Sequence, residues 1–272
     1  MNAPIGVFDS GIGGLSVLKA LRAALPHEDF IYLADNRHAP YGERDTAHVL
    51  ARSQAFTQHL VRQGIKALVV ACNTATAAAI DLLRTEHPNL PIIGVEPALK
   101  PAVALSKTGR IGVMATRSTL ASTRFQALLA AQAGAAQFVL QPCDGLADAI
   151  ERGASLPDAT EIIAACATNT TAMGSFGINP GQIDTLVLGC THYPFVSEHL
   201  QALVGSDVTL LANGEAVARQ TQRLLVGVAD GNGSAVTGQG RIGLFTTGDA
   251  YTLKAAAARW LALREPVQLL QI

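Results

Sequence analysis

Short apolar runs alternate along the chain with longer segments in which apolar residues recur every three or four positions. The short runs predict buried strands at residues 5–8, 30–34, 67–71 and 92–95. The periodic segments predict helices at residues 15–24, 46–63 and 75–84. Strands and helices that alternate at this spacing form right-handed βαβ units, so we expect a mostly parallel sheet covered by helices on both faces.

The same pattern starts again after residue 100. The run IGVMAT at residues 111–116 echoes IGVFDS at residues 5–10, and the apolar run that ends at Cys190 echoes the run that ends at Cys72. These echoes indicate an internal duplication. We therefore predict an α/β fold of two similar lobes, each a mostly parallel sheet flanked by helices.

A boundary between the lobes is expected near Pro97 and Pro101. The second lobe is predicted to cover residues 98–205. The pattern after it predicts a helix at 214–225, a Gly-rich loop around 231–240, a strand at 242–246 and a last helix at 254–263. Because the second lobe already has the strand count of the first, we expect this tail to return to the first lobe, which would comprise residues 1–97 plus 206–272.

Cys72 and Cys190 occupy matching positions in the two repeats, each at the end of a short apolar run. Open α/β sheets bind ligands at the carboxyl ends of their strands, where both thiols are expected to emerge. Two matched thiols are suited to act as acid and base on opposite faces of one substrate, as inversion of a carbon stereocentre requires. The alternative interpretation is a pair of unrelated buried cysteines, because free cysteine is among the most buried residue types.

Both cysteines precede a predicted helix start. Asn73 and Thr74 follow Cys72 and are residue types that cap helices, while Pro194 suits the first helical position after Cys190. Unpaired backbone amides and the positive end of a helix dipole favour a thiolate, so we expect the pKa of either thiol to lie below the usual ~8.5. The same amides are suited to hold an anionic ligand.

Asp9 ends the first predicted strand and opens the Gly-rich loop DSGIGGLS. These glycines do not form a GxGxxG dinucleotide motif, and the chain contains no GK[ST] of a P-loop. The loop can still present backbone amides to a carboxylate. Asp9 beside it is suited to accept from a substrate ammonium or to assist proton movement, and a carboxylate that caps a turn or helix is the alternative.

Two further residues are candidates for the same chemistry. His192 lies two residues after Cys190, where its imidazole would tune the thiolate or act as an auxiliary acid and base. A histidine that caps a helix is the alternative interpretation. Glu151 ends an apparent helix and, from the sequence pattern alone, is an ordinary solvated residue.

Composition narrows the functional classes. The 272 residues include 20 Lys and Arg and 21 Asp and Glu without a run of either sign, so the chain has no electrostatic footprint for nucleic acid or a membrane surface. No apolar stretch is long enough to span a bilayer, and the first residues lack the pattern of a secretory signal, so a cytoplasmic location is expected. The four cysteines are too widely spaced for a zinc ribbon or a CxxC motif, and Cys143 and Cys166 are given no role.

Five motifs occur in a fixed order along the chain: DSGIGGL at 9–15, PYG at 40–42, CNTAT at 72–76, VEP at 95–97 and GCTHYP at 189–194. In this order the sequence resembles the glutamate racemases of bacterial cell-wall synthesis, in the aspartate/glutamate racemase family. The likeness covers residues 5–249, and the last motif is the most specific. The resemblance implies two α/β lobes with the active site in the cleft between them, and interconversion of L- and D-glutamate that supplies D-glutamate for peptidoglycan synthesis.

The resemblance also implies roles for individual residues. The two motif cysteines, Cys72 and Cys190, would be the bases, and Asp9, Glu151 and His192 would assist them. Substrate contacts are implied for a larger set in the motif loops and the second lobe: Asp9, Ser10, Tyr41, Gly42, Asn73, Thr74, Thr116, Thr119, Thr191 and His192. Ala115 stands where the first lobe has Asp9, so we expect two similar bases with unlike helpers.

The resemblance implies a reaction without a cofactor or a metal. Pyridoxal phosphate would ease loss of the α-proton, but it needs a Schiff-base lysine, and none of the five lysines lies in a loop motif. Stabilisation of the developing charge must then come from amides at the helix starts and from Asn73, Thr74 and Thr191. The only partner expected is the small-molecule substrate. The oligomeric state is left open, with a homodimer among the options.

Three other interpretations compete with this one. A related isomerase acting on aspartate, hydantoins or maleate-like diacids would share the motifs. A non-catalytic two-lobed binding protein would explain the duplication but does not need a thiol at the same place in both lobes. A cysteine hydrolase would use Cys190 with His192 and would leave Cys72 idle.

Overall fold

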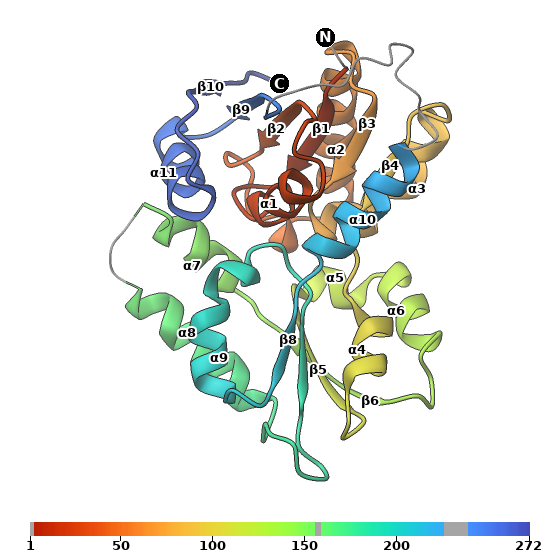
Figure 1. The fold of residues 1–272 in the computed structure, drawn as a ribbon, viewed down its shortest axis with the longest axis vertical. Helices are drawn as coiled ribbons and strands as arrows, with labels where there is room; N and C mark the ends of the chain where they lie inside the picture. Colours follow the sequence, from red (N-terminus) through yellow and green to blue (C-terminus); the bar gives the residue numbers. More distant parts are fainter. Residues whose placement is uncertain (1–2, 156–158, 226–238) are drawn as a thin grey trace.

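The computed structural model describes residues 3–155, 159–225 and 239–272 and divides its strands between two sheets (Figure 1). The strand order is β10-β9-β2-β1-β3-β4 in the larger sheet and β6-β5-β7-β8 in the smaller. Every pairing between these strands is parallel. The predicted α/β fold of two similar lobes is therefore confirmed.

The larger sheet carries helices on both faces. Its strands are β1 (Ile5–Asp9), β2 (Phe30–Ala34), β3 (Ala67–Val70), β4 (Ile92–Gly94), β9 (Ile242–Thr246) and β10 (Val267–Leu269). Side chains of α1 (Leu15–Ala24), α10 (Gly214–Leu225) and α11 (Ala250–Leu261) share one apolar cluster with the sheet. Side chains of α2 (Thr46–Arg62) and α3 (Asn73–Glu86) share another, on the opposite face.

The smaller sheet is covered in the same way. Its strands are β5 (Arg110–Ala115), β6 (Gln137–Pro142), β7 (Thr185–Leu188) and β8 (Thr209–Leu211). One apolar cluster includes side chains of α7 (Leu146–Gly153), α8 (Thr160–Ala172) and α9 (Ser197–Val204), and the other those of α4 (Leu99–Leu105), α5 (Arg117–Ala121) and α6 (Thr123–Ala130). The central strands β1, β3 and β7 are wholly buried, which explains why their sequences are continuous apolar runs.

The sheet orders show the duplication directly. The order β2-β1-β3-β4 in the first lobe is repeated as β6-β5-β7-β8 in the second, so β1 corresponds to β5 and β3 to β7. Cys72 lies two residues beyond β3, and Cys190 lies two residues beyond β7. The two thiols therefore occupy equivalent positions in the repeated unit.

The tail of the chain is shared between the sheets. Strand β9 pairs with β2, and β10 pairs with β9, so this part extends the first sheet. Strand β8 pairs with β7 in the second sheet. The chain therefore returns to the first sheet after β8, later than the expected residue 206. Residues 209–211 were too short an apolar run to be recognised as a strand. Most of the expected Gly-rich loop lies outside the described residues, and the division into two domains stays a prediction.

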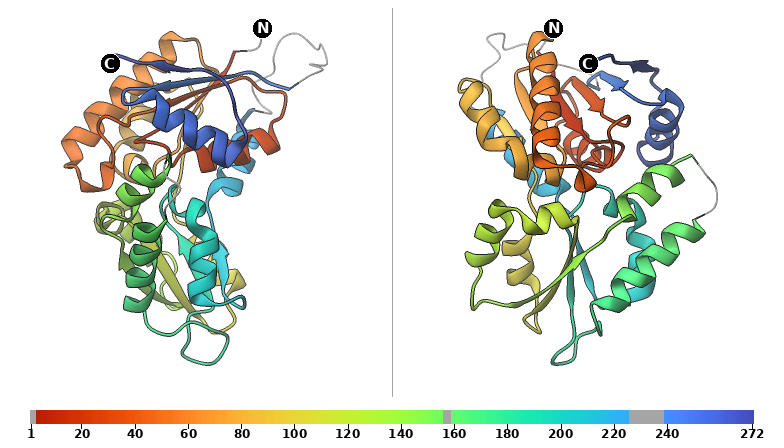
Figure 2. Two further views of the ribbon diagram at one scale, coloured as in Figure 1. Left: turned by 90° about the vertical axis from the view of Figure 1, so that its left-hand side faces the viewer. Right: turned by 180° about the vertical axis from the view of Figure 1, so that it is seen from behind.

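The carboxyl ends of the two sheets face each other. Thr74, which follows β3, lies beside Thr116, which follows β5, and Ser16 of the first lobe contacts the carbonyl of Thr191 in the second at 2.7 Å. The views in Figure 2 show the lobes joined end to end along the long axis, with α11 reaching toward the second lobe. There Trp260 stacks on Phe195 at a ring distance of 3.9 Å. None of the described helices has the length and apolar character needed to cross a membrane.

Candidate active site

Four strand ends frame the candidate site. Asp9 ends β1 and Cys72 follows its neighbour β3; in the second lobe Thr116 follows β5 and Cys190 follows its neighbour β7. In each sheet the next two strands of the chain lie on opposite sides of the first: β2 and β3 flank β1, and β6 and β7 flank β5. The connections therefore leave the first strand in opposite directions, which creates a crevice at its carboxyl end. Such a crevice is the usual ligand site of an open α/β sheet. The two crevices meet where the lobes face each other.

Cys72 caps the first turn of α3. Its sulfur accepts a hydrogen bond from the amide of Ala75 at 3.4 Å and lies 3.8 Å from the hydroxyl of Ser10. The Ser10 hydroxyl in turn lies 3.5 Å from Oδ1 of Asp9. A chain of polar groups therefore leads from the Cys72 thiol through Ser10 to a buried carboxyl group.

Asp9 is fully buried at the end of β1. Its Oδ2 accepts a hydrogen bond from the amide of Gly14 at 2.6 Å. Burial raises the pKa of Asp9 to about 6, although the charge of His192 and the Gly14 amide act in the opposite direction. A carboxyl group with this pKa can take up or release a proton near neutral pH.

Cys190 has a different neighbour. Its sulfur lies 3.5 Å from Nδ1 of His192, and Nε2 of the same ring lies 2.6 Å from Oε1 of Glu151. Burial alone would lower the pKa of His192, but its bonds to Cys190 and Glu151 raise that pKa well above the ordinary value. The ring therefore favours the imidazolium form, held between a sulfur and a carboxylate.

The Gly-rich loop after β1 packs directly against Glu151 and His192. An added Cβ at Gly11 would lie 1.9 Å from Oε1 of Glu151, and one at Gly13 would lie 2.5 Å from Nδ1 of His192. The Ile12 amide donates to Oε1 of Glu151 at 2.7 Å. The loop thus presents amides to carboxylates, as the sequence predicted, but these two carboxylates, Asp9 and Glu151, belong to the protein itself.

Two expectations about the thiols need correction. The pKa of Cys72 is not lowered but raised well above its ordinary value, because burial and the charge of Asp9 outweigh the Ala75 amide. The α-helix expected directly after Cys190 is preceded by a 3₁₀ turn, η2 (Tyr193–Val196), and begins only at α9. The prediction of a lowered pKa considered the helix end but not the loss of hydration that burial imposes on the Cys72 thiolate.

Three threonine hydroxyls connect the lobes beside the cysteines. Thr74 lies 3.1 Å from Thr116 and 3.4 Å from Thr119, and Thr116 lies 2.9 Å from Thr119. Gly42, in the 3₁₀ turn η1 (Tyr41–Glu43), approaches from the other side, where an added Cβ would lie 2.7 Å from the Thr116 side chain. The structure therefore brings these sequence-predicted residues together.

Other predicted substrate contacts already have protein partners. The Tyr41 hydroxyl donates to Oδ2 of Asp35 at 2.6 Å, and burial with this carboxylate raises the pKa of Tyr41. The Asn73 amide donates to the Val95 carbonyl at 3.4 Å, while its Oδ1 is buried without a hydrogen-bond partner. Asn73 therefore keeps one polar atom free for a further contact.

Sequence reasoning missed two residues at this site. Nδ2 of Asn36, just beyond β2, donates to Oε2 of Glu151 at 2.8 Å. The hydroxyl of Thr246, at the end of β9, donates to Oδ1 of Asn36 at 2.8 Å. Both follow from the carboxyl-end rule once it is applied to every strand of the first sheet instead of only the strands that end in cysteines.

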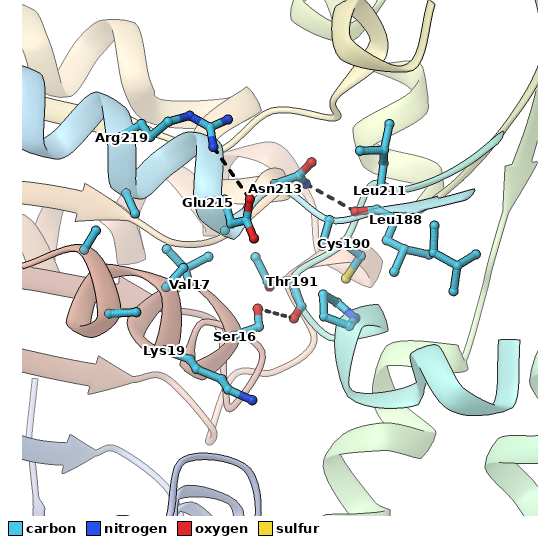
Figure 3. Close-up of a pocket in the computed structure, with 18 residues that line it drawn as sticks. Ser16, Val17, Lys19, Leu188, Cys190, Thr191, Leu211, Asn213, Glu215 and Arg219 are labelled. Carbon is cyan, nitrogen blue, oxygen red and sulfur yellow. Dashed lines mark hydrogen bonds and ion pairs between the residues drawn. The ribbon is translucent and has the colours of Figure 1, made fainter. Parts of the chain in front are cut away.

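A cavity of about 700 Å³ reaches the site from the side of α1 and α10 (Figure 3). Its lining includes Cys190 and Thr191 together with Ser16, Asn213 and Arg219. Figure 3 shows the Cys190 sulfur among the lining side chains. Cys190 is thus approached from two sides, by this cavity and by His192.

The groups available for chemistry are thiols, carboxylates, an imidazole and hydroxyls. In the described part of the chain, no group of three or more His, Cys, Asp or Glu side chains is arranged to hold a metal ion. Lysines occur at positions 19, 66, 100, 107 and 254, in helices or ahead of strands. These groups are suited to proton transfer to and from a small molecule.

Comparison with known proteins places these features in a family. The family model described as Asp/Glu/Hydantoin racemase matches residues 5–221. A glutamate racemase of Ectopseudomonas mendocina is 50% identical over 224 residues, covering 82% of each chain. The crystal structure of Escherichia coli glutamate racemase with L-glutamate and the activator UDP-MurNAc-Ala superposes with a TM-score of 0.84 at 29% identity, covering 99% of this chain and 98% of that one. A Francisella tularensis glutamate racemase with D-glutamate gives 0.81 at 27% identity, covering 100% and 97%.

Proposed function

The chain belongs to the Asp/Glu/hydantoin racemase family as an isomerase that acts on glutamate, and we propose that it interconverts L- and D-glutamate by a two-base mechanism. Cys72 and Cys190 are the two bases. The observation that carries the proposal is the equivalence of the two thiols, each two residues beyond the third strand of a repeated sheet. Relatives with bound L-glutamate and with bound D-glutamate support the substrate.

In this mechanism the two thiols begin in different protonation states. Burial and Asp9 raise the pKa of Cys72, so this group starts as a thiol that can donate a proton. His192, whose pKa is raised, favours the imidazolium form 3.5 Å from the Cys190 sulfur, and we assign the base role to Cys190. One base and one acid are thereby available at the same time, as inversion through a planar carbanion requires.

The reaction moves one proton at each face of the substrate. Cys190 removes the α-proton from one face while the Cys72 thiol delivers a proton to the other. The site resets when Nε2 of His192 passes its proton to Glu151 while Nδ1 takes the proton of Cys190, and when the Cys72 thiolate regains a proton through Ser10 from Asp9 in its protonated form. Glu151 then releases a proton to solvent and Asp9 takes one up. The opposite enantiomer reacts with the two thiols in exchanged roles.

A thiolate is a weak base for a proton beside a carboxylate, so the site must stabilise the charge that develops on the α-carboxylate. The amides at the start of α3, the side-chain NH₂ group of Asn73 and the hydroxyls of Thr74 and Thr191 are the candidate donors. Removal of one such donor typically costs ~3 kcal/mol in the barrier. Asn73 and Thr74 lie on the same helix turn as Cys72, which holds donor and base in fixed geometry.

The proposed reaction uses no pyridoxal phosphate, and its product has a proposed role in the cell. None of the five lysines lies in the loops that carry the thiols, so a Schiff-base partner is missing from those loops. The D-glutamate product would serve peptidoglycan synthesis in the cytoplasm. Growth of a D-glutamate auxotroph carrying this chain, but not its Cys72→Ser variant, tests that role.

The activity itself is tested by circular dichroism. Purified protein without added cofactor should convert D-glutamate to the racemic mixture with loss of the dichroic signal. D-Aspartate should turn over far more slowly. A preparation that leaves D-glutamate unchanged, or that prefers D-aspartate, contradicts the proposed substrate.

A further inference from the structure

The Glu151 carboxylate is held from both lobes. Oε1 accepts from His192 Nε2 at 2.6 Å and from the Ile12 amide at 2.7 Å, and Oε2 accepts from Asn36 Nδ2 at 2.8 Å. Two of these three donors, Ile12 and Asn36, belong to the first lobe, whereas Glu151 and His192 belong to the second. The orientation of the Glu151–His192 pair therefore depends on a side chain of the opposite lobe.

The Asn36 amide has only one orientation that fits its neighbours. The Thr246 hydroxyl accepts from the Gly248 amide at 3.1 Å and donates to Oδ1 of Asn36 at 2.8 Å. With Oδ1 facing a donor, Nδ2 must face Glu151. An added Cβ at Gly248 would lie 2.7 Å from Cβ of Asn36, so Gly248 leaves room for the side chain at this place.

The loop that carries Asn36 is anchored below it. Asp35, fully buried, accepts two hydrogen bonds from Arg52 at 2.8 and 2.9 Å. It also accepts from Thr247 at 2.7 Å, next to the residue that orients Asn36. Strand register places Ala34 opposite Thr246. These contacts within the first lobe fix Asn36 and Thr246 relative to each other and do not depend on Glu151 of the second lobe.

We propose that Asn36, oriented by Thr246, is a positioning residue that holds Glu151 so that His192 faces Cys190. This inference rests on the proposed two-cysteine mechanism. Without the Asn36 donor, Oε2 loses its partner and the carboxylate can turn about its terminal bond. His192 then loses its fixed orientation, and proton transfer at Cys190 slows. Cys72 has its own helpers in Ser10 and Asp9, so its proton transfer is affected less.

The proposal predicts a one-sided kinetic defect. Racemisation by Asn36→Ala should fall roughly 10- to 100-fold in kcat, with KM for glutamate changed by less than about threefold. Transfer at Cys190 becomes the slower step. The primary deuterium isotope effect with α-deuterated glutamate should therefore rise for the enantiomer that Cys190 deprotonates and should not rise for the other. The affected enantiomer should be the same one that Glu151→Gln affects.

Matched variants separate positioning from a general loss of structure. Thr246→Ser keeps the hydroxyl and should retain activity, whereas the isosteric Thr246→Val should reproduce the Asn36→Ala defect in weaker form. Arg124→Gln removes ion pairs to Asp81, at 3.1 Å, and to Glu96, which also join the lobes but lie outside this chain of contacts, and it should leave the isotope effects unchanged. Adding Asn36→Ala to Glu151→Gln should lower kcat by less than about twofold further, because both changes act through one carboxylate.

The outcomes distinguish the two proposals. Wild-type isotope effects in both Asn36→Ala and Thr246→Val, or a full additive loss in the Glu151→Gln background, overturn the role of Asn36. An unchanged rate of racemisation in Cys190→Ser overturns the two-cysteine mechanism instead. Equal isotope effects for both enantiomers in Asn36→Ala, with a lowered kcat, show a general structural defect and also overturn the positioning role.

Discussion

The carboxylate of Glu151 lies 2.6 Å from the imidazole of His192, although 41 residues separate them in the sequence. This contact gives Cys190 a helper that Cys72 lacks. Cys72 is served instead by the hydroxyl of Ser10 and the carboxyl group of Asp9. The repeated sheets therefore place two equivalent thiols beside two chemically different sets of polar side chains.

Glu151→Gln and Asp9→Asn should produce opposite defects. Each removes the terminal proton carrier of one thiol, and general acid–base groups typically contribute 10²- to 10⁴-fold to a rate. We expect each variant to lose kcat and to show a raised primary isotope effect for one enantiomer, the two variants affecting different enantiomers. Steady-state kinetics with both α-deuterated enantiomers measure this. Defects on the same enantiomer would contradict the pairing of helpers with thiols.

Asp9→Asn should also remove a pH-dependent loss of stability. Burial raises the pKa of Asp9 from 3.8 to about 6, so the folded protein binds this proton more tightly than the unfolded chain. The free energy of unfolding therefore falls as the pH rises from about 4 to about 6, by up to about 3 kcal/mol from this group. Urea unfolding of both proteins checks this. The stability of wild type relative to the variant should decrease over that range, and a constant difference would refute it.

Gly13→Ala should disable the site while leaving the lobes folded. The added methyl group would lie 2.5 Å from Nδ1 of His192, so the imidazole must shift from its place beside Cys190. A displacement of this size is expected to lower racemisation about 100-fold. Gly64→Ala is the control: its φ of 72° makes alanine strained, but nothing lies within 4 Å of the added methyl group. That variant should lose stability and keep its activity per folded molecule.

The two thiols should react unequally with iodoacetamide. Their exposed fractions are nearly equal, 5% for Cys72 and 6% for Cys190, so access to the reagent is matched. The raised pKa of Cys72 keeps it in the unreactive thiol form, whereas Cys190 lies beside an imidazolium. Mass spectrometry at neutral pH should find Cys190 alkylated at least about fivefold faster. Faster reaction at Cys72 would contradict the proposed resting protonation states.

Much of the fold could be predicted because the central strands are buried on both faces. The sequences of β1, β2, β3 and β9 are compact apolar runs, and their bounds agree with the predicted strands within one residue or so. Strand β6 was missed because it is a partly exposed edge strand that ends in a proline, Pro142. Strands β8 and β10 contain only three residues each, too few for a periodic signal.

The site was predictable wherever its residues stand in continuous motifs. Cys72, Cys190 and Asp9 could be placed from strand ends, because a parallel sheet brings those ends together. Glu151 had no local signal, since its contact with His192 depends on how α7 meets the other lobe. Asn36 and Thr246 depend on the pairing of β2 with β9, which the sequence pattern does not reveal. The pKa of Cys72 was misjudged because burial depends on closure of the lobes.

Racemisation by the proposed two-base mechanism needs both cysteines. Each glutamate enantiomer is incubated in D₂O with wild type, Cys72→Ser, Cys190→Ser and, as a control, Cys166→Ala, a buried cysteine of α8 outside the site. Loss of the α-proton is followed by NMR and loss of optical rotation by polarimetry. We predict that both active-site variants racemise at least about 100-fold more slowly than wild type, while Cys166→Ala remains active. A near wild-type rate in either Cys72→Ser or Cys190→Ser would contradict the two-base mechanism.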